Sequence, residues 1–338
     1  MRLGRQSSYG AGVLGRFDGI TASYGIAQET SINGVAGVLS DFSYGSKPTF
    51  VGASAIKGPV TLYAINQRVE GTTDRRAMGA EFRYFEVNKT AYALLDYDTY
   101  FNELNAAQVM GTVVAYGGTA NFMVDHRKAP SLSIRNALLG ASTSSVNELL
   151  QTMSADSLRD LALARTATSN MAQIGISIPL HKQWQMSGDL RLTNTSGLPA
   201  SGTTPLEGIL PAMPGRGTEK SVTGQLVGNS LYTDNDIWSG SITLNTSSAV
   251  NGFSIYLYNY TLLGKRWTMN PSLQLYRLKD QFGTTTNLTS PMIRGTYRIR
   301  DQLNLDMDCG YEVTDSSGVQ QTTKTTRIFY SAGLRWDF

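Results

Sequence analysis

The sequence predicts an all-β chain that folds into a transmembrane, antiparallel, up-and-down β-barrel of about 18 strands, with 16 strands as the alternative. Three observations support this prediction. Apolar side chains recur at every second position along most of the chain, short and long connections alternate, and the last segment has an apolar face that ends on Phe338. A terminal strand with such a face favours aggregation in water, whereas a bilayer accommodates it.

The composition agrees with this fold class. The 338 residues contain no run of 18 or more apolar residues, so we expect no transmembrane helix. A formal charge of +3, from 29 basic and 26 acidic residues, is too balanced to predict nucleic-acid binding. The single cysteine, Cys309, excludes an internal disulfide and a cysteine-based metal cluster, and we expect no cofactor and no metal.

Eighteen segments have the period of two that is typical of strands. In 303–311 the odd positions are apolar and the even positions are polar or glycine, and in 184–193 the even positions form the apolar side. Similar patterns occur at 78–85, 91–99, 172–178, 238–245, 253–258, 267–276, 291–299 and 326–338. Weaker patterns, in which Gly and Ala blur the two faces, occur at 20–28, 32–39, 49–56, 60–69, 107–116, 120–127 and 221–229, and the weakest pattern is at 2–8.

The connections give an independent check, because bacterial barrels have short periplasmic turns and longer external loops. The short connections are 27–31, 57–60, 87–89, 116–119, 180–183, 233–236, 263–266 and 300–302. The alternate connections include all the long ones: 9–18, 41–48, 70–75, 129–166, 196–218, 280–286 and 313–325. An even number of strands then predicts that both termini are periplasmic.

The four tryptophans agree with this orientation. Each lies near a predicted short-turn end and has the parity of the apolar face, and together with the terminal phenylalanine they predict an interfacial aromatic belt: Trp184, Trp238, Trp267, Trp336 and Phe338. Indole rings favour the headgroup boundary of a bilayer. The alternative is that they are core residues of a soluble β-sandwich.

These patterns, with the terminal sequence Leu334-Arg335-Trp336-Asp337-Phe338, resemble Gram-negative outer-membrane β-barrels over essentially the whole chain. The resemblance implies a bacterial outer-membrane location in contact with lipid and lipopolysaccharide. It also implies that the barrel assembly machinery reads the closing aromatic residue.

A narrower resemblance concerns the opening segment, 4–6 and 12–19, which is similar to barrel domains attached to tetratricopeptide-repeat proteins that export exopolysaccharide. It implies an upstream periplasmic repeat domain or secretion partners. No apolar signal-peptide segment follows Met1, so we expect that the natural protein is longer.

The charged residues of the strands have the parity opposite to the apolar face, which predicts that they line the lumen: Glu81, Arg83, Asp96, Asp98, Asp125, Arg127, Asp189, Arg191, Arg294, Arg298, Asp306, Asp308, Arg327 and Arg335. An Arg on the lipid face near the midplane would cost about 2–4 kcal/mol. Two interpretations are open. The charges pair across strands and stiffen the wall, or the arginines of 294–335 form a basic ladder for an anionic solute, with two aspartates between them.

Tyr256, Tyr258 and Tyr260 are also predicted to face the lumen, because Phe253, Ile255 and Leu257 have the opposite parity. Rings in a pore offer flat faces to sugars, while their hydroxyls form hydrogen bonds. The alternatives are that these tyrosines belong to the interfacial belt or that a bulge shifts their parity.

The connection 129–166 is predicted to contain two short helices within an extracellular loop or plug. Ser145 and Glu148 have the spacing of a capping box, Ser157 and Asp160 repeat it, and leucines follow each pair. The helices could fold into the mouth of the barrel, or lie over the rim against a neighbouring protomer. The proline-rich connection 196–218 is not expected to be helical and is either a second cover or a flexible surface loop.

No enzyme is predicted. His126 and His181 are the only histidines, and Asp125 points to the opposite side of the strand from His126. No nucleophile elbow, zinc motif or phosphate-binding loop occurs. The sequence predicts a passive outer-membrane conduit, as the barrel domain of a polymer exporter, with exopolysaccharide as the expected polymer. The alternatives are a stand-alone diffusion porin for small polar solutes and a membrane anchor or scaffold with a sealed lumen.

Overall fold

A computed structural model describes residues 1–7, 12–13, 15–40, 45–318 and 321–337. Within these residues there are 18 strands, so the prediction of 18 is confirmed and the alternative of 16 is wrong. The strands are β1 (Arg2–Ser7), β2 (Arg16–Ala27), β3 (Thr30–Leu39), β4 (Thr49–Lys57), β5 (Val60–Val69), β6 (Thr72–Phe85), β7 (Lys89–Asp98), β8 (Glu103–Ala115), β9 (Gly118–Ala129), β10 (Ala167–His181), β11 (Trp184–Thr195), β12 (Gly217–Asn229), β13 (Ile237–Thr246), β14 (Val250–Leu263), β15 (Trp267–Asp280), β16 (Thr285–Arg300), β17 (Leu303–Ser317) and β18 (Thr322–Trp336).

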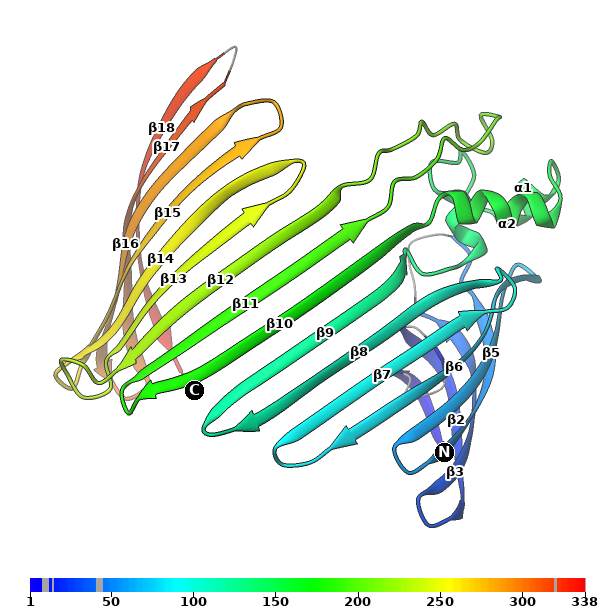
Figure 1. The fold of residues 1–338 in the computed structure, drawn as a ribbon, viewed down its shortest axis with the longest axis horizontal. Helices are drawn as coiled ribbons and strands as arrows, with labels where there is room; N and C mark the ends of the chain where they lie inside the picture. The colour runs from blue at the N-terminus through cyan, green and yellow to red at the C-terminus, as the bar shows by residue number, and fades with distance from the viewer. Residues whose placement is uncertain (8–11, 14, 41–44, 319–320, 338) are drawn as a thin grey trace. The chain divides into compact units, whose positions relative to one another are not determined.

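The strands form an 18-stranded sheet of up-and-down type. From β1 to β8, and again from β12 to β18, each strand pairs antiparallel with the next one in the chain (Figure 1). The chain divides into two compact units. The first comprises Met1–Val113, Phe122–Ala172 and Thr193–Arg216, and the second comprises Val114–Asn121, Gln173–Leu192 and Gly217–Phe338.

The helical elements lie between β9 and β10, as predicted. They are the 3₁₀ helix η1 (Ile134–Leu138) and the α-helices α1 (Val146–Leu150) and α2 (Ala155–Ala164). We call residues 130–166 the insertion. Neither α-helix in the described part of the chain is long and apolar enough to cross a membrane.

Short turns alternate with longer connections, as predicted, with three corrections. The connection 313–325 is mostly strand, because β17 continues to Ser317 and β18 begins at Thr322; β-branched threonines pair there across the strands and favour extended structure despite their polarity. Likewise β6 begins at Thr72, within the predicted loop 70–75. The turn predicted at 233–236 begins earlier, since β12 ends at Asn229. Parts of the predicted loops 9–18 and 41–48 lie outside the described residues.

Side chains alternate between two faces of each strand. Along β5 the residues Thr61, Tyr63, Ile65, Gln67 and Val69 are buried, and the residues between them are more exposed. One face of the strands carries large apolar side chains, among them Leu62 in the first unit and Leu257 in the second, at 56% and 47% exposure. We call this the outward face and the opposite one the inward face. In water such a continuous apolar surface would be unfavourable, whereas acyl chains would solvate it.

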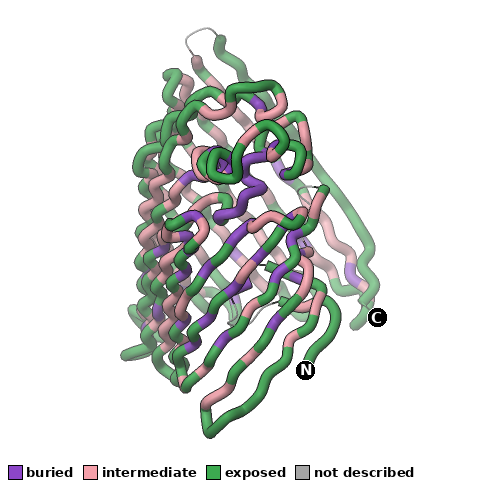
Figure 2. The backbone as a smooth tube through the Cα atoms, turned by 90° about the vertical axis from the view of Figure 1, so that its right-hand side faces the viewer, coloured by how far each residue is buried: buried purple, intermediate pink, exposed green. Residues whose placement is uncertain are grey.

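Many of the buried apolar residues of the first unit form two clusters. Figure 2 colours all buried residues purple along the backbone. One joins the insertion to Val69 at the end of β5 and to Phe101 in the β7–β8 turn. The other lies on the inward face of β2–β6, where Phe17 meets Phe50 edge to face with ring centroids 5.1 Å apart. The inward face of β2–β6 is therefore partly apolar. The sequence did not predict this feature.

Candidate functional site

The insertion is held on the inward face of the first unit by polar side chains of β5–β8. The first of these is Asp74, which lies at an irregularity of β5–β6 pairing, between the partners Gln67↔Arg75 and Arg68↔Thr73. Because an inserted residue re-aims its side chain, Asp74 can point toward the insertion. Its carboxylate accepts hydrogen bonds from the Ser133 hydroxyl at 2.6 Å and the Ile134 backbone N–H at 2.9 Å.

A second bulge does the same on β8. Asp96 pairs with Ala106 and Tyr97 with Leu104, which leaves Asn105 between them without a partner across the ladder. The Asn105 side-chain oxygen accepts the Leu132 backbone N–H at 2.8 Å, and its amide donates to Asp96 at 2.9 Å. Two bulges on different strands thus hold the start of the insertion.

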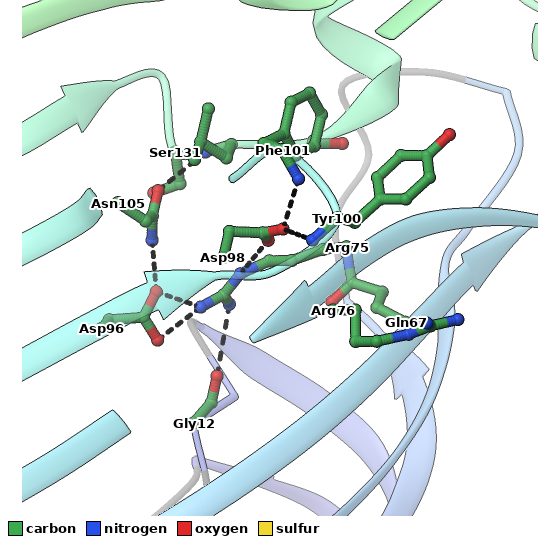
Figure 3. A network of polar contacts seen from close by, with 12 residues as sticks. Gly12, Gln67, Arg75, Arg76, Asp96, Asp98, Tyr100, Phe101, Asn105 and Ser131 are labelled. Atoms are coloured by element: carbon green, nitrogen blue, oxygen red, sulfur yellow. Dashed lines mark hydrogen bonds and ion pairs between the residues drawn. The ribbon is translucent and has the colours of Figure 1, made fainter. Parts of the chain in front are cut away.

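Arg75 links Asp96 to Asp98 at the centre of this network (Figure 3). Its guanidinium lies between Asp96 and Asp98 and also donates to the Gly12 carbonyl at 3.3 Å. All three charged side chains are at most 3% exposed. Buried charges are stable only when they are paired and hydrogen-bonded, so this cluster tolerates little rearrangement.

Two further contacts fix the aspartates. The Tyr63 hydroxyl donates to Asp96 at 2.6 Å. The Tyr63 ring lies over Gly79, the residue that pairs with Tyr63 on β6, and a Cβ atom at Gly79 would overlap the ring. The Asp98 carboxylate accepts the backbone N–H groups of Tyr100 and Phe101 at 2.8 and 3.0 Å. The two hydrogen bonds to Asp98 stabilise the β7–β8 turn, and Phe101 of this turn belongs to the apolar cluster of the insertion.

Glu70, in the turn between β5 and β6, holds the beginning of α1. Its carboxylate accepts hydrogen bonds from the Ser145 hydroxyl at 2.7 Å, the Asn147 backbone N–H at 2.8 Å and the Ser46 hydroxyl. Burial alone would raise the pKa of Glu70, but these hydrogen bonds outweigh it and lower the pKa below its ordinary value. A carboxylate is also favoured at a helix N-terminus by the helix dipole.

The capping prediction is confirmed for α1 and wrong for α2. Ser145 caps α1 and accepts the Glu148 backbone N–H at 3.4 Å. The cap of α2 is Ser154, not Ser157, because Ser154 has the extended backbone of a capping residue and accepts the Ser157 N–H at 3.1 Å. Leu149, Leu158 and Leu161 of these helices are buried, as expected from the apolar stripe.

The connection between β11 and β12 covers the insertion. It is not helical, as predicted, and two isolated bridges, Leu198↔Met213 and Ser201↔Leu210, fold it back on itself. Arg165, at the end of α2, is 1% exposed and donates to the Gly208 carbonyl of this cover and to the Ala137 carbonyl of η1. Of the two predicted alternatives, a cover describes this connection better than a flexible loop.

The charged residues predicted to line the lumen share the inward face, and most of them pair. The pairs are Glu81–Arg83, Asp125–Arg127, Arg75 with Asp96 and Asp98, Arg294–Asp308, Arg335–Asp306 and Arg327–Glu312, and Asp189 accepts a hydrogen bond from Gln173. Arg191 and Arg298 are exposed. Three of the four arginines of the predicted basic ladder therefore face carboxylates, which favours the interpretation of a stiffened wall over that of an anion track.

The predicted aromatic belt lies at strand ends. Trp184 and Trp267 begin β11 and β15, Trp238 is second in β13, and Trp336 ends β18. The Trp238 indole N–H donates to Asp236 at 3.0 Å. Phe338 lies outside the described residues. Each tryptophan is therefore at a short-turn end, where the prediction of a belt placed it.

Sequence reasoning missed Asp74 and Asn105, which bind the insertion. It also missed two supporting residues, Gln67, which donates to Asp74, and Arg75, which pairs with Asp96. Asp74 and Arg75 fell within a connection assigned as loop, and nothing in the residue pattern shows a bulge. Asp96 and Asp98, which were predicted to line the lumen, lie in this cluster, where they are buried and paired with Arg75.

The described residues contain no group of three or more His, Cys, Asp and Glu side chains arranged to hold a metal ion. His126 hydrogen-bonds the Asn170 side chain, with 2.7 Å between Nδ1 and Oδ1. The neighbouring Asp125 is paired with Arg127 instead.

The described strands, antiparallel and up-and-down, with an apolar outward face and paired charges on the inward face, have the fold class of outer-membrane β-barrels. No protein-family model and no curated protein matches the chain. Solved structures align with it at low similarity. A bacterial polysaccharide outer membrane secretin has 10% identity and a TM-score of 0.34, over 91% of this chain and 97% of that chain.

Two other structures align over similar lengths. In-vitro folded OmpT, an outer membrane protein of Vibrio cholerae, has 8% identity and a TM-score of 0.41, over 94% of this chain and 97% of its own. A double variant of OccD1 (OprD) has 8% identity and a TM-score of 0.36, over 92% and 97%. Such low values carry no argument about function, so the proposed function rests on this chain's own residues.

Proposed function

We propose that this chain is a passive conduit through the bacterial outer membrane, with its termini in the periplasm and its external opening narrowed by the insertion. The observation that supports this most is the docking of the insertion on the inward face, through Asp74 and Asn105. A segment that served only as a surface loop would not need buried contacts with the wall of the barrel. Long external loops commonly narrow the lumen of such barrels.

The more specific form of this proposal is the barrel part of an apparatus that exports a polymer, for which the similarity of the opening segment to exopolysaccharide exporters is the support. A diffusion porin for small polar solutes is the competing form. Both need an aqueous path, and both fit an inward face of paired charges that adds little net field. The barrel as a mere anchor would need a lumen that is sealed permanently.

Planar-bilayer conductance of the refolded chain tests the proposal. Two proteins are compared: the complete chain, and a variant in which a short Gly-Ser linker replaces 131–165. We expect a steady conductance that rises several-fold on deletion, because the insertion narrows the path. If the deletion variant does not insert, Asp74→Ala combined with Asn105→Ala loosens the same segment within the full-length chain. Absence of conductance in the complete chain and in both variants would contradict a conduit.

A further inference from the structure

The inward face of the second unit carries a pair of parallel aromatic rings on β14. Tyr256 and Tyr258 are two residues apart on the strand, their ring centroids are 6.4 Å apart and their planes differ by 13°. Tyr256 is 42% exposed, although it lies opposite in parity to the apolar Leu257. Tyr258 is half-buried. Parallel aromatic rings on the polar side of a strand can form a surface on which a flat apolar group stacks.

Uncharged hydrogen-bonding groups border the two rings on both neighbouring strands. On β13, Ser241 and Ser239 lie opposite Tyr256 and Tyr258, and on β15, Gln274 and Ser272 occupy the corresponding positions. The border extends to β12, where the Gln225 amide donates to the Ser239 hydroxyl at 3.0 Å. Hydroxyl and amide groups both donate and accept hydrogen bonds, so they suit ligands that do the same.

The adjacent charges compensate one another. Arg294, on β16, is bound to Asp308 on β17 with 2.6 Å between Nε and Oδ1, and the Ser331 hydroxyl donates to the same carboxylate at 3.0 Å. The opposite charges of Arg294 and Asp308 leave the surface with little net charge, so the surface should attract an ionic solute only weakly.

We propose that this surface, centred on Tyr256 and Tyr258, is a binding subsite for uncharged carbohydrate chains. The C–H face of a pyranose ring would stack on the tyrosines, while its hydroxyls would bond to the serine, glutamine and phenol groups. This inference rests on the proposed function, since the surface meets cargo only if the inward face lines an aqueous path. It deepens that function by naming the class of cargo.

Calorimetric titration of the detergent-solubilised chain tests the subsite without requiring an open pore. The probes are maltohexaose, an acidic hexagalacturonate of equal length, and polyethylene glycol of similar size. We expect saturable binding of the neutral hexasaccharide and clearly weaker binding of the other two. Binding of the acidic chain that is as tight as that of maltohexaose, or no binding of any sugar, would overturn the proposal.

Variants separate stacking from simple wall packing. Replacing both rings, Tyr256→Leu with Tyr258→Leu, should weaken hexasaccharide binding about tenfold or more. The double variant Tyr256→Phe with Tyr258→Phe retains both rings and should lose less affinity. Tyr311→Leu is the matched control, because Tyr311 is 44% exposed but lies on the outward face of β17. An equal loss in the control would overturn the assignment to the inward face.

Conductance keeps this inference distinct from the proposed function. A conducting chain that binds no hexasaccharide would disprove the subsite and leave the conduit standing. A chain that binds the hexasaccharide but conducts nothing would retain the subsite and contradict the conduit.

Discussion

Loosening the start of the insertion is the perturbation whose effect follows most directly from the structure. The double variant Asp74→Ala and Asn105→Ala removes three hydrogen bonds to the insertion, from the Ser133 hydroxyl and the backbone N–H groups of Ile134 and Leu132. At about 0.5–1.5 kcal/mol for each bond, docking should weaken by roughly 1.5–4.5 kcal/mol, or about one to three powers of ten in the opening equilibrium. The strands lose no ladder bond, because only side chains change, although Gln67 and Asp96 each lose one side-chain hydrogen bond.

Amide hydrogen exchange of 131–138, followed by mass spectrometry on the protein in detergent micelles, measures this equilibrium. We expect exchange of the segment to accelerate by that factor while exchange of β12–β17 stays unchanged. Asp160→Ala is the control, because the Asp160 side chain lies in the insertion but is 74% exposed. Unchanged exchange of 131–138 in the double variant would refute the anchoring role of the two bulges.

Three further predictions concern the ion cluster, the α1 contact and the aromatic belt. Arg75→Met should lower the free energy of unfolding by about 3–5 kcal/mol, because it leaves two buried carboxylates unpaired. The control Arg76→Met removes an exposed side chain and should change this free energy by less than about 0.5 kcal/mol. Urea unfolding measures both, and equal midpoints for the two variants would contradict the role of Arg75. The pKa of Glu70 is lower in the folded chain than in the unfolded one, so its contribution to α1 docking is present above the unfolded pKa and is lost as pH falls through the folded pKa. The protection factor of the Asn147 amide, which is its exchange rate relative to the intrinsic rate at the same pH, should therefore fall in acid, and Glu70→Gln should remove that dependence. Tryptophan fluorescence in liposomes should be quenched more strongly by bromines near the headgroup than by bromines at the acyl midplane, and the reverse order would exclude an interfacial belt.

The number of strands and their sidedness could be predicted because a bilayer imposes one rule along the whole chain. Every spanning strand must turn alternate side chains toward lipid, so segments such as 303–311 carry the signal in their own residues. The tryptophans could be placed for the same reason. The prediction of a loop at 313–325 was wrong. Its threonines are polar, which favoured a loop assignment, but β-branched residues pair well in a β-ladder.

The anchor of the insertion could not be predicted in the same way. A bulge inserts one residue and reverses parity locally, so Asp74 and Asn105 point inward without any trace in the period-two pattern. The Arg75 cluster joins residues from β6, β7 and β8 with Gly12, and such tertiary contacts have no local signature. The capping of α1 by Ser145 could be predicted, because it depends on residues within one helical turn.

The sidedness of β17 tests the central claim most directly, and the chain's one cysteine provides the probe. Cys309 lies on the outward face between Ile293 and Tyr330, and the adjacent Asp308 lies on the inward face. In liposomes, a membrane-impermeant charged maleimide should label Asp308→Cys in a Cys309→Ser background rapidly and leave native Cys309 unmodified, while a lipid-soluble maleimide should reach Cys309. Equally rapid labelling of both positions by the charged reagent would contradict an apolar face turned toward lipid and a wet face turned inward.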